Sequence, residues 1–148
     1  MLNIAVIGTG DWGRNLVRNF YEIEKANLKI CCDLDMNALE KIREKYPSVG
    51  ITTDYGEVIE DKEVDAVVIA TPTQTHFDLT KRALEAEKHI LVEKPFTLNY
   101  KQAQELVDLA KEKGKKLMVG HLLEYHPAIM EMRKRLSQNE IGEIYYLY

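Results

Sequence analysis

Three glycines near the N-terminus have the spacing of a phosphate-binding turn. Gly8, Gly10 and Gly13 follow an apolar run and open a segment of helical period. In such a turn the first glycine permits the tight bend, the second lets the backbone approach a pyrophosphate, and the third allows close helix packing. The N–H groups at the helix start would then face the anion. We therefore predict a phosphate-binding turn, and the alternative is a glycine-rich turn without a ligand. The predicted turn consists of Gly8, Thr9, Gly10, Asp11, Trp12 and Gly13.

An acidic residue stands 20 positions after the last of these glycines. Asp33 ends a second apolar run, where a carboxylate can accept both hydroxyl protons of an adenosine ribose. Asp35 adds a second negative charge. At an effective dielectric of about 20, a 2′-phosphate about 5 Å from a carboxylate is repelled by about 3 kcal/mol per unit charge. We therefore predict NAD as the cofactor, with NADP disfavoured about a hundredfold, while the alternative for Asp33 is a cap for the next helix.

Polar residues also follow three later apolar runs. Because the carboxyl ends of parallel strands share one edge of a sheet, these residues are expected on one rim. Lys94, at the end of a buried strand, would be partly removed from water, which favours the neutral amine that exchanges protons. It could instead reach solvent or pair with Glu93. The candidate cofactor-binding residues of this rim are Thr71, Pro72, Thr73, His76, Glu93 and Lys94.

The histidines allow more than one interpretation. His76 is equally well explained as a site residue and as a structural histidine with satisfied hydrogen bonds. His121 follows the last predicted strand of the sheet and is a second catalytic candidate beside Lys94. His121 and His126 are five residues apart, do not share a helical face and have no third ligand at a usual spacing. We therefore predict no metal site.

The pattern of apolar runs positions these residues. Short Val-, Ile- and Leu-rich runs alternate with longer segments of helical period, which is typical of repeated βαβ units. We predict an α/β fold, a doubly wound parallel sheet with helices on both faces. The six predicted strands cover residues 2–7, 28–33, 51–52, 66–70, 89–93 and 116–120. The helical stripes expected to face the sheet are Trp12, Leu16, Val17, Phe20 and Ile23, and Ala103, Leu106, Val107 and Ala110.

The C-terminal part of the chain follows a different pattern. A helix is predicted over residues 127 to about 138, a turn over 139–142 and a strand over 143–148. A strand with three tyrosines and two aliphatic residues needs a partner sheet. We expect a dinucleotide-binding domain over 1–120, a connecting helical segment over 121–142, and in 143–148 the first strand of a missing substrate domain. The chain alone should then associate as its concentration rises; an edge strand on the first sheet is the alternative.

Composition and charge narrow the class of protein. The chain has 148 residues, 45% hydrophobic and 30% charged, as in ordinary soluble domains. Its apolar runs fall far short of the roughly 20 residues that cross a bilayer, and no signal-peptide pattern opens it, so we expect no membrane partner. A formal charge of -4 provides no basic field for nucleic acid. The adjacent Cys31 and Cys32 form no disulfide framework, which favours a cytoplasmic setting.

Taken together, these motifs resemble the Gfo/Idh/MocA oxidoreductase family. The resemblance rests on the glycine turn, Asp33, Thr71-Pro72 with His76, and Glu93-Lys94-Pro95. It extends from Met1 to about Gly142 and matches the family's N-terminal Rossmann domain. It implies an NAD(P)-dependent dehydrogenase acting on CH–OH groups of sugars, sugar nucleotides, cyclitols or related carbonyl compounds. It also implies a further domain that closes the active site, and we expect a homo-oligomer in the full-length protein.

The resemblance assigns roles to several residues. In the family, the lysine matching Lys94 lies beside the nicotinamide and the substrate, and the Lys-Pro peptide is often cis. The cofactor is lined by residues matching Thr71, Pro72, His76 and Glu93. The predicted reaction is reversible hydride transfer between a secondary alcohol carbon and nicotinamide C4, with Lys94 exchanging the proton and His121 as a second candidate. The alternative is a non-catalytic NAD-binding sensor or assembly module.

Overall fold

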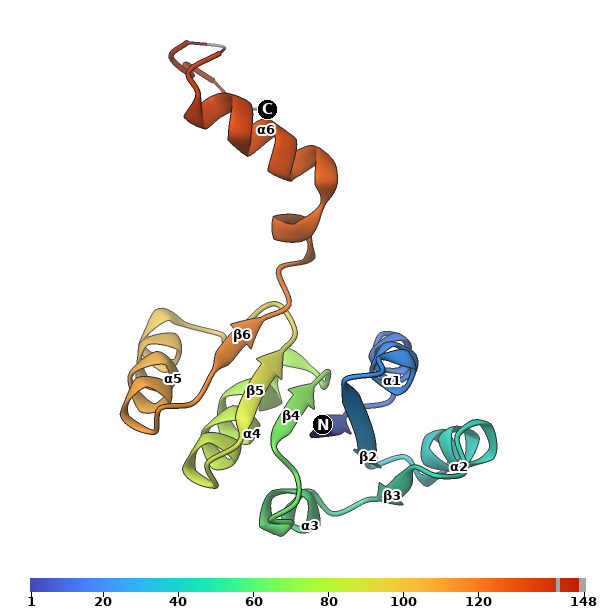
Figure 1. The fold of residues 1–148 in the computed structure, drawn as a ribbon. Helices are drawn as coiled ribbons and strands as arrows, with labels where there is room; N and C mark the ends of the chain where they lie inside the picture. The colour runs from blue at the N-terminus through green and yellow to red at the C-terminus, as the bar shows by residue number, and fades with distance from the viewer. Residues whose placement is uncertain (141, 147–148) are drawn as a thin grey trace.

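The carboxyl ends of six parallel strands meet along one edge of the sheet (Figure 1). The structure is a computed structural model and describes residues 1–140 and 142–146. The strand order β3-β2-β1-β4-β5-β6 is that of the doubly wound Rossmann fold, so the predicted fold class is confirmed. The strands are β1 (Leu2–Ile7), β2 (Ala26–Cys32), β3 (Gly50–Thr52), β4 (Ala66–Ile69), β5 (His89–Val92) and β6 (Leu117–Val119).

Strand β1 lies in the middle of the sheet and pairs on both sides. Ile7 is in register with Cys32 of β2 and with Ile69 of β4. Successive side chains of β1 point to opposite faces, so Ala5 joins one hydrophobic core and Val6 joins the other. The glycine turn that follows β1 therefore opens at the centre of the rim, between the ends of β2 and β4.

The residues predicted to end the strands lie just beyond them. Asp33, Ala70, Glu93 and Gly120 follow β2, β4, β5 and β6 directly. Their backbone N–H groups still donate to the neighbouring strand, as from Ala70 to Ile7 at 2.8 Å. The chain leaves the sheet at these positions, so the polar residues that follow the strands lie along one rim, as predicted.

Different helices cover the two faces of the sheet. Val17 of α1 and Leu39 of α2 are buried in one core. Helices α3, α4 and α5 cover the other face, where Leu84, Leu106 and Ala110 are buried, as the predicted α5 stripe requires. The bounds are α1 (Gly13–Glu22), α2 (Met36–Lys45), α3 (Tyr55–Glu60), α4 (Thr73–Glu85) and α5 (Tyr100–Glu112).

Two residues of the predicted α1 stripe do not face the sheet. Leu16 and Val17 are buried and Phe20 is half-buried, whereas Trp12 and Ile23 are 47% and 46% exposed. Both exposed residues flank the helix instead of lying within it. The helical period therefore does not direct their side chains towards the core. The Trp12 side chain lies at the edge of the sheet where the carboxyl ends of the strands meet.

Beyond β6 the chain runs away from the sheet into η1 (Leu122–Tyr125) and α6 (Pro127–Ser137) (Figure 1). Asn139 and Gly142 have φ of 58° and 69°, which agrees with the predicted turn. The predicted strand over 143–148 is wrong for residues 143–146, which form no strand, because no strand of the described part pairs with them. Residues 147–148 lie outside the described part of the chain. Within the described residues, no helix is long and apolar enough to span a membrane.

Candidate functional site

The glycine turn is held by backbone contacts. Gly8 has φ of +89°, and its N–H donates to the Cys32 carbonyl oxygen at 2.8 Å. A Cβ on Gly8 would lie 2.7 Å from the Ala70 carbonyl oxygen, and one on Gly13 would lie 1.9 Å from the Gly8 carbonyl oxygen. A Cβ on Gly10 would meet nothing within 4 Å. Two glycines are thus required by the fold, and the third faces open space that a ligand can fill.

The carboxylate of Asp33 is fixed to this turn. Its Oδ2 accepts from the backbone N–H and the Oγ1 hydroxyl of Thr9, at 2.6 and 2.9 Å, and its Oδ1 accepts from the Asp35 N–H at 3.0 Å. Burial acts to raise the pKa of Asp33, but the hydrogen bonds from Asp35, Thr9 and Leu34 outweigh it, so the pKa lies below its ordinary value. The carboxylate is therefore ionised at neutral pH.

The alternative role of Asp33 as a helix cap is wrong. The cap of α2 is Asp35, whose side chain accepts from the Asn37 N–H at 2.9 Å. Asp33 lies two residues earlier, and its side chain is directed to the glycine turn. Asp35 therefore caps the helix and Asp33 contacts the glycine turn, because only Asp35 lies beside the first N–H groups of α2.

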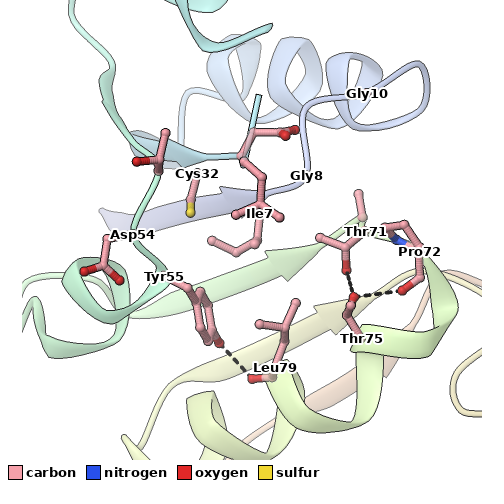
Figure 2. A pocket seen from close by; sticks show the side chains of 14 residues that line it. Ile7, Gly8, Gly10, Cys32, Asp54, Tyr55, Thr71, Pro72, Thr75 and Leu79 are labelled. Atoms are coloured by element: carbon pink, nitrogen blue, oxygen red, sulfur yellow. Dashed lines mark hydrogen bonds between the residues drawn. The ribbon is translucent and has the colours of Figure 1, made fainter. Parts of the chain in front are cut away.

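A pocket of about 710 Å³ lies between the ends of β1, β2 and β4 (Figure 2). Its wall at α4 is held together by the Tyr55 hydroxyl, which donates to the Leu79 carbonyl oxygen at 2.7 Å, and by the Thr71 and Thr75 hydroxyls, which are 2.7 Å apart. A mainly apolar hollow with the Asp33 carboxylate fixed at the end of β2 suits an adenosine. It is lined by Ile7, Gly8, Gly10, Cys32, Asp33, Leu34, Thr53, Asp54, Tyr55, Ala70, Thr71, Pro72, Thr75 and Leu79.

Sequence reasoning missed part of this lining. Thr53, Asp54 and Tyr55 directly follow β3, so the rule that strand ends line the rim would have found them if applied to that short strand. Leu79 enters from the side of α4 and had no such signal. Eight predicted residues are not in this lining: Thr9, Asp11, Trp12, Gly13, Thr73, His76, Glu93 and Lys94. Among them, Thr9 is buried, Thr73 begins α4, and Asp11 is fully exposed and paired with Arg14.

A second pocket, of about 400 Å³, lies on the other side of the glycine turn. It is lined by Trp12, Ala70, Thr71, Glu93, Lys94 and Leu122. The Trp12 Nε1–H donates to Glu93 Oε1 at 2.6 Å, and the Lys94 N–H donates to Glu93 Oε2 at 3.3 Å. The Lys94–Pro95 peptide is cis, as the family resemblance implied. The two pockets share Ala70 and Thr71 and so meet beside the turn.

The side chain of Lys94 differs from the prediction. The expected partial removal from water is wrong, since Lys94 is exposed. The described residues contain no ion pair between Lys94 and Glu93. Glu93 turns inward and is 8% exposed, while the chain leaves the sheet after it and carries Lys94 outward. Of the three interpretations of Lys94, the structure favours the one in which its ammonium reaches solvent.

His76 connects the two loops that border the pockets. It is 1% exposed, and its Nδ1 and Nε2 lie 2.8 Å from the carbonyl oxygens of Pro95 and Thr71. It is absent from the lining of the pockets described above. Its side chain therefore acts beneath the rim, where it holds the ends of β4 and β5 together, and the structure favours the interpretation of His76 as a satisfied structural histidine.

His121 lies with Lys94 around a third hollow, of about 780 Å³, beside η1. Both side chains are exposed, so the rim does bring the two catalytic candidates to a common space. The Nδ1 of His126 accepts from the Ala128 N–H and caps α6. Among residues 1–140 and 142–146, no group of three or more His, Cys, Asp or Glu is placed to hold a metal ion.

A parallel sheet of this order, with a glycine turn at its centre and a carboxylate at the end of β2, defines a dinucleotide-binding domain. The sequence matches the Gfo/Idh/MocA family, an oxidoreductase family with an NAD-binding Rossmann fold, over residues 2–121. The chain belongs to this family. The predicted resemblance is thereby confirmed.

Named relatives cover most of this chain. The scyllo-inositol 2-dehydrogenase (NAD(+)) of Bacillus subtilis is 34% identical over 96% of the chain, and the 2,7-anhydro-N-acetylneuraminate hydratase of Escherichia coli is 31% identical over 97%. The crystal structure of myo-inositol 2-dehydrogenase from Lactobacillus plantarum superimposes with a TM-score of 0.89 at 27% identity, covering 97% of this chain and 43% of that one. The chain spans 42% and 38% of the length of the two curated relatives.

One similar structure carries the other nicotinamide cofactor. A 3-ketoreductase from Actinomadura kijaniata, in complex with TDP-benzene and NADP, has a TM-score of 0.87 at 27% identity, with 97% of this chain and 44% of that chain covered. The family is one with an NAD-binding Rossmann fold, while the choice between NAD and NADP depends on the residues of this chain.

Proposed function

We propose that this chain is the cofactor-binding part of an NAD-dependent dehydrogenase that acts on a sugar, sugar nucleotide or cyclitol. The reaction transfers a hydride between a secondary alcohol carbon and nicotinamide C4, and the cofactor supplies the hydride chemistry. The observation that carries the proposal is the glycine turn, which lies between Asp33 on one side and Lys94 on the other. A dinucleotide needs an anion site at its middle and a nucleoside site on each side.

On the β2 side, Asp33 supports NAD. The carboxylate is ionised and held by Thr9 and Asp35, and its negative charge suits the hydroxyl donors of a ribose. A 2′-phosphate would meet this negative charge and that of Asp35. The rim near Asp33 carries Leu34, which is 93% exposed, in place of a cation. These features support a preference for NAD over NADP.

On the β5 side, Lys94 supports proton exchange with the substrate. Oxidation of an alcohol gives a hydride to the nicotinamide and a proton to a base, and reduction reverses both transfers. The exposed ammonium of Lys94 can hold the reacting oxygen, and His121 lines the same hollow. The polyhydroxylated substrates in the names of two relatives, scyllo-inositol and myo-inositol, support the substrate class.

Binding and turnover test the proposal separately. This chain is titrated by calorimetry with NADH, NADPH and ADP-ribose. NADH and ADP-ribose should both bind, since they share the adenosine half, and NADPH should bind more weakly than NADH. Inositols and sugar nucleotides are then assayed by NADH absorbance with protein that spans the full length of the relatives. A chain that binds none of the three nucleotides would overturn the proposal.

The second candidate is a non-catalytic NAD-binding module that senses redox state or recruits a partner. The observation that favours it is a set of exposed apolar side chains on the segment that runs away from the sheet. Leu122, Leu123, Tyr125 and Tyr145 are 56%, 68%, 64% and 89% exposed. NADH binding without turnover in the full-length protein, together with association that depends on these side chains, would favour the module, and turnover would exclude it.

A further inference from the structure

One hydrogen bond joins the glycine turn to the loop that carries Lys94. The indole Nε1–H of Trp12 donates to Glu93 Oε1 at 2.6 Å, across 81 positions of sequence. Trp12 is 47% exposed, so core packing does not explain a tryptophan at this position. The residue is also the single tryptophan of the chain. Its indole N–H is therefore the group whose role needs an explanation.

The Glu93 carboxylate is enclosed on several sides. It is 8% exposed, and Oε2 accepts from the Lys94 backbone N–H at 3.3 Å. A Cβ on Gly120 would lie 3.0 to 3.1 Å from the carboxylate atoms, so the end of β6 also packs directly on it. A buried carboxylate needs donors for both oxygens. In this structure the indole supplies the donor for Oε1.

The position of Glu93 has a consequence for the neighbouring ammonium. Lys94 follows Glu93 in sequence and lines the same pocket, so the ammonium and the carboxylate border one space. Across residues 1–140 and 142–146, the Lys94 ammonium has no hydrogen bond or ion pair, and the side chain is exposed. The carboxylate is instead directed towards the glycine turn by Trp12.

We propose that Trp12 is a positioning residue whose indole N–H holds the Glu93 carboxylate away from the Lys94 ammonium. The ammonium then stays unpaired above the pocket, ready to meet a substrate oxygen. This role in the reaction rests on the proposed function, whereas the hydrogen bond and the state of Lys94 do not. Without the indole donor, the buried carboxylate would need another partner, and the cation that lines the same pocket is Lys94.

The state of Lys94 can be measured on this chain without a ligand. The acylation rate of each lysine by acetic anhydride is followed by mass spectrometry, with Lys101, an exposed residue of α5, as the internal reference. Trp12→Phe should slow acylation of Lys94 several-fold relative to Lys101, because an ion-paired ammonium yields its neutral amine less readily. Trp12→Phe combined with Glu93→Gln should restore the rate, since a neutral amide cannot pair with the ammonium.

The controls separate this role from damage to the fold. Tyr21→Phe removes the hydroxyl of another exposed aromatic residue, outside the pocket, and should leave the Lys94 rate unchanged. Thermal unfolding of each variant checks that the sheet is intact. A wild-type rate for Lys94 in Trp12→Phe would overturn the proposal, and so would a double variant that stays as slow as the single one. Failure of the chain to bind NADH would contradict the proposed function but would leave these labelling rates unaffected.

Discussion

The carbonyl oxygen of Gly8 lies 1.9 Å from the place where a Cβ on Gly13 would be. The first and third glycines of the turn are therefore in backbone contact, and α1 starts directly against the end of β1. Gly10, between them, has no atom within 4 Å of the corresponding position. Gly8 and Gly13 are thus required for packing, whereas Gly10 leaves room for a ligand to approach the backbone.

Alanine substitutions should separate these two functions of the turn. Gly13→Ala is expected to lower the free energy of unfolding by about 3 kcal/mol or more, because the methyl group overlaps backbone. Gly10→Ala should change it by less than about 1 kcal/mol and yet weaken NADH binding about tenfold, since the methyl group occupies the approach to the pyrophosphate. Urea unfolding and calorimetry measure the two effects. Equal losses of stability in both variants would contradict this division.

Asp33 should make stability depend on pH in the acid range. Its pKa in the folded chain lies below its ordinary value of 3.8, so the unfolded chain takes up a proton first as the pH falls. The stabilisation is complete above the ordinary value and is lost as the pH falls towards the folded pKa. The difference in Tm between wild type and Asp33→Asn should be constant above about pH 5 and shrink below about pH 4. A difference that grows in acid would contradict the assignment.

The same carboxylate should set the cofactor preference. Wild type is expected to bind NADH about a hundredfold more tightly than NADPH, from the repulsion of about 3 kcal/mol between carboxylate and 2′-phosphate. Asp33→Asn should reduce this ratio about tenfold or more, because the amide keeps the size of the side chain and loses its charge. Glu40→Gln, on the exposed surface of α2 and paired with Arg43, is the charge-matched control. Tighter binding of NADPH by wild type would refute the preference.

Lys94 should affect turnover and leave cofactor binding nearly unchanged. In the full-length enzyme, Lys94→Ala is expected to lower kcat by about a hundredfold or more, equivalent to about 2.7 kcal/mol of transition-state stabilisation. The dissociation constant for NADH should stay within about twofold of wild type. Lys101→Ala removes an exposed lysine of α5 and serves as the control. Unchanged turnover in Lys94→Ala would remove this residue from the mechanism.

His76 should contribute to stability through its two carbonyl partners. His76→Phe keeps a ring in the buried space but removes the ring nitrogens that lie 2.8 Å from the Thr71 and Pro95 carbonyl oxygens, at an expected cost of about 2 to 4 kcal/mol. Thr80, also on α4, offers a contrast, because its buried hydroxyl has no partner among the described residues. Thr80→Val should leave the free energy of unfolding unchanged or raise it by about 1 kcal/mol. Denaturant unfolding of the two variants tests the pair.

The bounds of β1 and the position of Asp33 could be predicted from short sequence patterns. The β1 bounds were predicted to the residue, since Leu2–Ile7 is apolar except at Asn3 and is followed by the glycine turn. Asp33 was found because the distance from the turn is set by one βαβ unit. The division of roles between Asp33 and Asp35 was not resolved, because both carboxylates stand before the same helix and only the three-dimensional path directs one to Thr9.

Contacts between distant segments could not be read from the sequence. Trp12 was assigned to a core stripe, since helical spacing says nothing of an acceptor 81 positions away. The side chain of Lys94 was expected to be partly buried because the strand before it is buried. It is exposed because the backbone turns out of the sheet at this position. The strand predicted over 143–148 is not formed at residues 143–146 for a related reason: residues of high β-propensity form a strand only where a neighbouring strand pairs with them.

The first strand of the chain is the middle strand of the sheet, and this order has a consequence for biosynthesis. When β1 emerges from the ribosome, one of its edges has no partner until β4 has been made, and Trp12 has no acceptor until Glu93 follows. During that interval the exposed strand edge can pair with other nascent chains and is a target for chaperones. The pocket beside the glycine turn is therefore completed only after β4 and Glu93 have followed the turn out of the exit tunnel.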